Sequence, residues 1–273
     1  MVSSILFLLI RWLDIFMLSI FKTSYEVGIY NAALPTASIL ILVLYSFKYM
    51  LLPKSTEFLS NGNIKEMKEN YQTTVKWIFL LTLPIFVLML IFPGKFLGFL
   101  FGSEFTRGGM TLSVLAIGYF YASIIGPTGD ILISAGKTKQ FMAIFSVITI
   151  LDLTMNYLLI PTWSYLGAGI ALTTSFIIGW SFSVILVYRE LKIIPFNKKL
   201  LKPSLLALLF SMPLYILTKN YEMSISQIVI VSVAFVVIYV SMLFKLKVFE
   251  EQELKLIKSF KDRVCGWNRR NSQ

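Results

Sequence analysis

Long apolar segments alternate with short polar stretches along the whole chain. Eight of these segments have about 18 residues or more, which is enough for a helix to cross the ~30 Å hydrocarbon core of a bilayer. Such a helix satisfies its backbone polar groups internally. We therefore expect an all-α polytopic membrane protein. The expected helices occupy residues 3–22, 30–52, 75–92, 110–135, 140–160, 166–188, 200–218 and 225–244.

The basic residues are divided unequally between the two sides of such a bundle. If the N-terminus is cytoplasmic, nineteen of the 25 Lys and Arg residues fall on inner loops and in the tail from Lys245, and four fall on outer loops. Cytoplasmic loops of membrane proteins carry such an excess of basic residues. The pattern predicts a multi-pass cell-membrane protein with both termini cytoplasmic, with Lys65 and Lys198 inside and with Glu104 and Tyr165 outside.

The composition excludes several classes of protein. At 57% hydrophobic and 14% charged residues, the chain is not an ordinary soluble domain. Attraction of the basic loops to anionic lipid headgroups accounts for the net charge of +11, so we expect membrane lipid and no nucleic acid as a partner. The absence of His and the single Cys265 exclude His-ligated metals, a cysteine zinc cluster and an internal disulfide. We expect neither a metal nor a cofactor.

Two stretches outside the spans have helical periodicity. Ile64, Met67 and Tyr71 recur among Lys and Glu residues and predict a short cytoplasmic amphipathic helix. The tail 245–273 has a similar pattern, with apolar residues set against Lys and Arg. It is expected to lie on the inner leaflet, and a solvated, frayed tail is the alternative.

Small residues and a proline mark the expected outer corners. Gly28, together with two alanines four and five residues later, predicts close approach of two helices, and Gly167 predicts the same at the next outer corner. Pro161 follows a long apolar run and is expected to end its helix at the outer interface.

The loops carry a more specific signal. Six motifs occur in order: EVGIYNAALP at 26–35, LPKSTEF at 52–58, LFGSEF at 100–105, GPTGD at 126–130, AGKTK at 135–139 and NYLLIPTWSYLGAGIA at 156–171. In this order and at this spacing they resemble the polysaccharide flippase branch of the multidrug/oligosaccharidyl-lipid/polysaccharide exporter superfamily. The resemblance covers nearly the whole chain.

This resemblance implies one half of a two-lobed transporter. Members of the superfamily typically have two six-helix lobes that form a V around a central cavity, and many polysaccharide flippases have two further helices. Residues 1–190 would then form the second lobe, 191–244 the appended helix pair and 245–273 a basic cytoplasmic tail. The N-terminal lobe would come from a separate chain or a second copy. A fragment, a split gene or internal initiation would explain the abrupt start at Met1.

Polar side chains within the spans are the candidates for substrate binding, because such groups are costly in hydrocarbon and usually face a cavity or a partner. Arg11 and Asp14 lie three residues apart on one face of the first helix. They are expected either to receive an anionic lipid headgroup or to form a structural ion pair. Lys48 lies near the inner end of the second helix, where it either reaches a cavity or extends to the interface.

Three further candidates lie in later helices. Asp130 follows Gly126 and Pro127, which are expected to bend or break the fourth helix and make a hinge or a cavity wall. A simple kink with Asp130 paired to a neighbouring helix is the alternative. Asp152 and Asn156 lie four residues apart on one face of the fifth helix. They would either make hydrogen bonds between helices or line the transport path, and any ion or proton coupling must use these carboxylates.

Three functions remain open at this stage. The motifs favour a flippase that moves lipid-linked oligosaccharide or polysaccharide precursor from the cytoplasmic to the outer leaflet by alternating access. A cation-coupled exporter of small molecules on the same fold is the alternative. A membrane glycan polymerase or ligase would need a large outer loop with catalytic groups, and the longest outer loop, 93–109, has as its charged residues only Lys95, Glu104 and Arg107. We therefore expect a transporter and not an enzyme.

Overall fold

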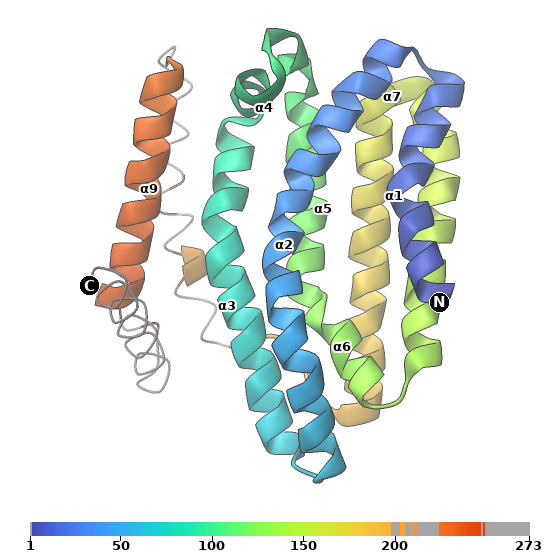
Figure 1. The fold of residues 1–273 in the computed structure, drawn as a ribbon, viewed down its shortest axis with the longest axis vertical. Helices are drawn as coiled ribbons and strands as arrows, with labels where there is room; N and C mark the ends of the chain where they lie inside the picture. The colour runs from blue at the N-terminus through green and yellow to red at the C-terminus, as the bar shows by residue number, and fades with distance from the viewer. Residues whose placement is uncertain are drawn as a thin grey trace, which may run out of the picture.

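The computed structural model describes residues 2–197, 203–205, 209, 211, 224–246 and 248, without the side chains of residues 2–11 and 225. These residues form a helical bundle without strands, as the apolar pattern predicts (Figure 1). Its elements are α1 (Val2–Phe21), α2 (Ser24–Ser60), α3 (Ile64–Ile91), α4 (Pro93–Phe101), the 3-10 helix η1 (Ser103–Gly108), α5 (Gly109–Ile125), α6 (Pro127–Ser134), α7 (Thr138–Leu191) and α9 (Ile225–Lys245). The expected helix 200–218 and the expected tail 245–273 fall almost entirely outside the described residues.

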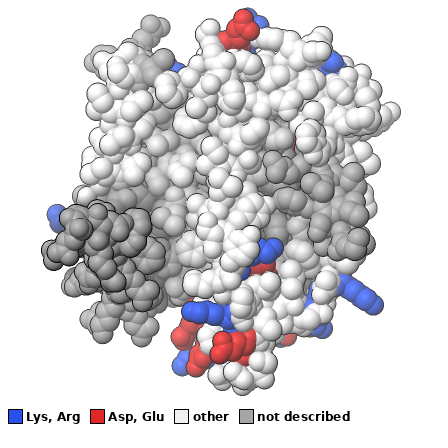
Figure 2. Space-filling model, in the orientation of Figure 1, with Lys and Arg blue, Asp and Glu red and all other residues white. Residues whose placement is uncertain are grey.

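The described helices have the length and composition of membrane spans. Five helical segments of the described chain are long and apolar enough to cross a bilayer. Figure 2 shows charged side chains gathered mainly at the end of the bundle that holds the α2–α3 turn, with a few at the opposite end. The surface between these ends is almost uncharged, so the fold is that of a multi-pass membrane protein.

Helix α7 is a hairpin of two antiparallel arms, residues 138–163 and 165–191, which turns at Ser164. The backbone of Ser164 has φ 50° and ψ −135°, far from helical values. Residues on either side of the turn meet across the arms. The Phe145 and Trp180 rings are 5.9 Å apart, and Gln140 donates a hydrogen bond of 2.8 Å to Glu190. The arms confirm the expected helices 140–160 and 166–188.

The first arm continues for two residues past Pro161, so the expectation that this proline ends the helix is wrong by less than a turn. A proline removes only the hydrogen bond to the carbonyl four residues earlier, which lets a helix run on briefly.

The turn between the two arms of α7 requires a residue without a side chain at Gly167. A β-carbon there would lie 2.5 Å from the carbonyl oxygen of Leu159, so the expected close approach is confirmed. A β-carbon on Gly28 would meet nothing within 4 Å, so the expected approach is wrong for this residue. The alanines at 32 and 33 are buried in the core, as expected of small residues where helices pack.

A polar network joins the two outer turns of the bundle. The Glu26 carboxylate accepts hydrogen bonds from the backbone nitrogen of Thr23 at 3.1 Å and from the Ser164 hydroxyl at 2.5 Å. Lys22 donates to the Pro161 carbonyl oxygen at 3.0 Å. The α1–α2 turn and the α7 turn are therefore fastened to each other.

Helices α2 and α3 are longer than the sequence predicts. Helix α2 runs through Pro35 and Pro53, although the 52–58 motif was expected to lie beyond its end. Prolines are tolerated inside membrane helices because neighbouring groups can satisfy the freed backbone. The expected short amphipathic helix is the first part of α3. Its Met67 and Tyr71 are fully buried, because they pack against the bundle and not against the membrane surface.

The fourth expected span is broken at the predicted place. Helix α5 ends at Ile125, and α6 begins at Pro127. Tyr71 of α3 makes a hydrogen bond of 2.7 Å with Thr128 of α6, which holds the short helix in the bundle. Helix α5 packs against α2, α3 and α7 and forms the centre of the core. Helix α9 lies beside α3, where the Tyr239 hydroxyl donates to the Leu80 carbonyl oxygen at 3.4 Å.

Candidate functional site

Four polar side chains meet inside the apolar bundle, where α1, α2 and the first arm of α7 converge. We call them the acid cluster, and they are Asp14, Tyr30, Asp152 and Asn156. All four are fully buried. The Tyr30 hydroxyl donates to Asp14 Oδ2 at 2.5 Å, and Asn156 Nδ2 donates to Asp14 Oδ1 at 2.7 Å. Asp14 of α1 thus joins the next helix, α2, and the first arm of α7, which lies more than a hundred residues later in the chain.

Asp152 is held differently from Asp14. Its carboxyl lies against that of Asp14, and neither of its oxygens has a hydrogen-bond partner among the described residues. The same is true of the side-chain oxygen of Asn156. Two ionised carboxylates only accept hydrogen bonds, so they cannot satisfy each other unless a proton or a cation lies between them.

The acid cluster therefore has the chemistry of a site for a proton or a small hard cation, which prefers oxygen ligands. Among the described residues no group of three or more His, Cys, Asp or Glu side chains could hold a metal ion. With one of the two carboxyls of Asp14 and Asp152 protonated, the pair carries one negative charge and balances one monovalent ion.

The structure changes how two sequence expectations are understood. The described partners of Asp14 are Tyr30, Asp152 and Asn156, and the side chain of Arg11 lies outside the described residues. Asp152 and Asn156 were expected either to make hydrogen bonds between helices or to line the transport path. Asn156 makes such a bond, to Asp14 of α1, and both side chains are fully buried. Sequence reasoning missed Tyr30. Its position inside the 26–35 motif, on the helix that follows Asp14, was the available signal.

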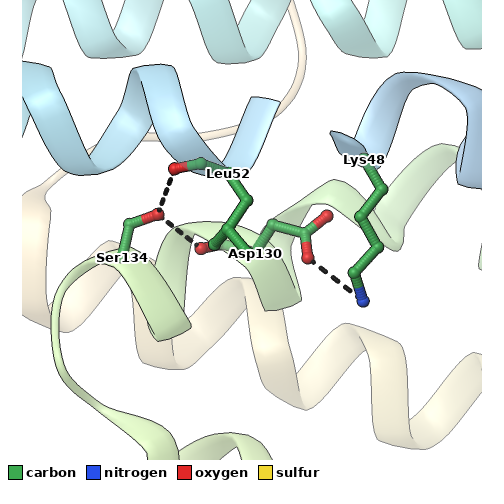
Figure 3. A network of polar contacts seen from close by, with 4 residues as sticks. All are labelled: Lys48, Leu52, Asp130 and Ser134. Atoms are coloured by element: carbon green, nitrogen blue, oxygen red, sulfur yellow. Dashed lines mark hydrogen bonds and ion pairs between the residues drawn. The ribbon is translucent and has the colours of Figure 1, made fainter. Parts of the chain in front are cut away.

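The second polar site joins α2 and α6 near the α5–α6 break (Figure 3). Lys48 Nζ lies 3.4 Å from Asp130 Oδ1, and the side chains are 41% and 4% exposed, respectively. The Ser134 hydroxyl donates to the Asp130 carbonyl oxygen at 2.8 Å and lies 3.4 Å from that of Leu52. The predicted break and the predicted pairing of Asp130 with a neighbouring helix are both confirmed.

Two cavities lie beside these sites. An apolar cavity of about 150 Å³ has Asp14 in its wall and is otherwise lined by aliphatic and aromatic side chains and a serine from α2, α5 and both arms of α7. A second cavity of about 410 Å³ is open and is bounded on one side only, by five residues of α2 that include Lys48. Lys48 is half exposed beside it, which agrees with both of its sequence interpretations.

Comparison with known proteins identifies the fold. A family model described as MatE matches residues 1–158. The chain is 29% identical over 64% of its length to a protein of Haloferax volcanii named as a probable low-salt glycan biosynthesis flippase, Agl15, and covers 37% of that protein. It is 26% identical over 68% of its length to a putative O-antigen transporter of Shigella flexneri, and covers 42% of it.

A solved structure has the same fold. The lipid II flippase MurJ in an inward closed conformation matches 89% of this chain with a TM-score of 0.67 at 14% identity, and the match covers 52% of MurJ. The chain therefore spans less than half the length of the two named relatives and about half of MurJ. These proteins are transporters and flippases by name, not enzymes.

Proposed function

Because the chain belongs to the MatE family, we propose that it forms one lobe of a flippase for a lipid-linked glycan precursor. The proposed movement is from the cytoplasmic to the outer leaflet by alternating access, with both termini on the cytoplasmic side. Two relatives support this proposal, since both are named for glycan biosynthesis or O-antigen transport. In the structure, one observation carries it. Lys48, which is paired with Asp130 and half exposed, lies beside an open cavity of about 410 Å³ on one face of α2, where an anionic headgroup could bind.

The acid cluster would supply the coupling. A cation or proton can drive a conformational cycle only if its affinity differs between the two states of the transporter. Asp14 and Asn156 belong to α1 and α7, so a rearrangement of these helices would change the number of oxygens around a bound cation. Neither side-chain oxygen of Asp152 accepts a hydrogen bond from a described donor. Its contact with the cation would therefore change most when these helices rearrange.

Lys48→Gln should weaken binding of a polyprenyl diphosphate roughly ten- to hundredfold, because one charge-assisted contact contributes roughly 1.5–3 kcal/mol. Polyprenol without phosphate should bind the variant and the parent equally. Binding to the purified protein can be followed by tryptophan fluorescence. Lys54→Gln is the matched control, since Lys54 lies on the same helix but outside the cavity. Equal loss in both lysine variants, or none in Lys48→Gln, would contradict the proposed headgroup contact.

A cation-coupled exporter of small molecules is the second candidate function. The cavity of about 150 Å³ favours it, because aromatic rings line it and the Asp14 carboxyl lies in its wall. A lipophilic cation suits such a site. In that case Lys48→Gln would leave binding of tetraphenylphosphonium unchanged or stronger, and polyprenyl diphosphate would not bind the parent protein.

We also propose that activity requires a second lobe, from a separate chain or a second copy, because an alternating-access cavity between two lobes needs both walls. The chain spans about half of the flippase that it resembles in fold. Purified 273-residue chain, reconstituted at no more than one copy per liposome, should therefore leave a fluorescent lipid-linked sugar in its original leaflet. Flipping in liposomes that hold a single copy would refute this requirement. Reconstitution with a six-helix first lobe should restore the activity.

A further inference from the structure

Residues of helix α2 line both the cavity beside the acid cluster and the cavity beside Lys48. Helix α2 contributes Leu34, Ser38 and Tyr45 to the apolar cavity, which contains Asp14 in its wall. The same helix contributes Tyr45 and Lys48 to the larger cavity. Tyr45 therefore lies in the wall of both cavities. At 1.5 Å per residue, Leu34 and Lys48 are roughly 21 Å apart along the helix, a large part of the bilayer thickness.

The other aromatic rings that line the apolar cavity beside Tyr45 pack against one another in pairs. Tyr119 of α5 packs edge-on against Phe176 of α7, with centroids 5.4 Å apart. Phe145 and Trp180 pack in the same manner between the two arms of α7, at 5.9 Å. These pairs fix the far wall of the cavity. Tyr45 is half-buried and lines both the apolar cavity and the open cavity beside the half-exposed Lys48.

The acid cluster needs a route for exchange with water. Its members are fully buried, so an ion can reach the carboxyl of Asp14 only if a neighbouring side chain moves. The apolar cavity already extends from Asp14 as far as Tyr45. Rotation of one aromatic side chain is fast compared with the rearrangement of helices, and the face of a tyrosine ring attracts a passing cation.

We propose that Tyr45 is the gate of a cation path that connects the acid cluster with the Lys48 cavity. With the ring in its present position the path is closed between the two cavities, and rotation of the ring joins them. A monovalent cation or a hydrated proton then reaches Asp14 from the Lys48 side. This inference rests on the proposed function, because it takes the acid cluster as the coupling site.

Thiol accessibility tests the gate without measuring transport. The reporter is Ile148→Cys in a full-length protein that also carries Cys265→Ser, since Ile148 is fully buried and lines the apolar cavity. The probe is 2-aminoethyl methanethiosulfonate, a small cationic thiol reagent. Tyr45→Ala should raise the modification rate of the reporter at least tenfold, and Tyr45→Trp should lower it. Tyr45→Phe keeps the ring and should keep the slow rate.

Tyr49→Ala is the matched control, because Tyr49 lies one turn later on α2, is 86% exposed and lines only the larger cavity. It should leave the rate unchanged. Equal rates in the Tyr45→Ala variant and its parent, or no modification in any variant, would overturn the gate. Size-exclusion profiles exclude unfolding as the cause of a fast rate. A raised modification rate in Tyr45→Ala, together with unchanged diphosphate binding in Lys48→Gln, would support the gate and contradict the proposed headgroup contact.

Discussion

Replacing Asp152 with asparagine should remove the stabilisation of the protein by the proposed coupling cation without lowering the stability of the cation-free protein. Both carboxyl oxygens of Asp152 are buried without a described hydrogen-bond partner, and the carboxyl of Asp14 lies beside them. An amide at this position brings a donor toward Asp14 and removes one buried charge, so the fold gains or keeps stability. The loss of a charged oxygen ligand should weaken cation binding roughly 100-fold, or about 2.7 kcal/mol.

Melting temperatures of the purified protein can measure this effect. A ligand that binds the folded state raises the melting temperature in proportion to ln(1 + [L]/Kd). The parent protein should respond to one of three series, in which Na⁺, K⁺ or pH is varied at constant ionic strength, and Asp152→Asn should respond to none. Asp14→Asn is the informative comparison. It disturbs the acceptor of Tyr30 and Asn156 and should itself lower stability by about 1–3 kcal/mol. A full cation response in Asp152→Asn would exclude Asp152 as a ligand.

Gly167→Ala should lower the thermal stability of the protein strongly for so small a substitution. The added β-carbon would lie 2.5 Å from the Leu159 carbonyl oxygen and 2.7 Å from the carbon that bears it. Backbone atoms cannot rotate away as a flexible side chain can, so the turn at Ser164 would have to open. Overpacking of this kind costs about 1–3 kcal/mol and occasionally more. Thermal unfolding followed by size-exclusion chromatography measures the loss.

Gly28→Ala is the matched control for this substitution. Gly28 is also helical and lies near the outer end of α2, but an added β-carbon there would meet nothing within 4 Å. Alanine is favoured over glycine in a helix by up to about 1 kcal/mol, so this variant should unfold at the same or a higher temperature. Equal melting of the two variants would show that the α7 turn tolerates a wider spacing than its backbone distances indicate.

The apolar runs were enough to predict most spans, because membrane helices must satisfy their own backbone groups over a fixed length. The ends of α2 were harder to predict. Pro53 is a stop signal in a soluble helix but is accommodated here, so LPKSTEF continues the helix. The break at Gly126 was predictable because a proline follows directly.

The acid cluster was only partly visible in the sequence. The spacing of Asp152 and Asn156 placed them on one face, which the helix period alone determines. Their meeting with Asp14 and Tyr30 depends on how α1 and α2 pack against α7, which no local pattern encodes. A polar stripe on a helix can face a cavity between two lobes or the interior of one lobe, and its sequence pattern is the same in both cases. In this protein the stripe with Asp152 and Asn156 faces the interior, because neighbouring helices bury both side chains.

The fastening of the two outer turns gives α1 the mechanics of a lever. Lys22, directly after α1, and Glu26, in the first turn of α2, tie the α1–α2 turn to the α7 turn, so a rearrangement at the acid cluster would tilt α1 about that end. Asp14 lies eight residues from Lys22, roughly 12 Å along the helix axis, and Val2 lies twenty residues from it, roughly 30 Å. A sideways displacement of about 1 Å at Asp14 would thus become roughly 2.5 Å at the opposite end. The position of the carboxyl along the helix sets this amplification, and moving it one turn toward the pivot would increase it to about 4.5-fold.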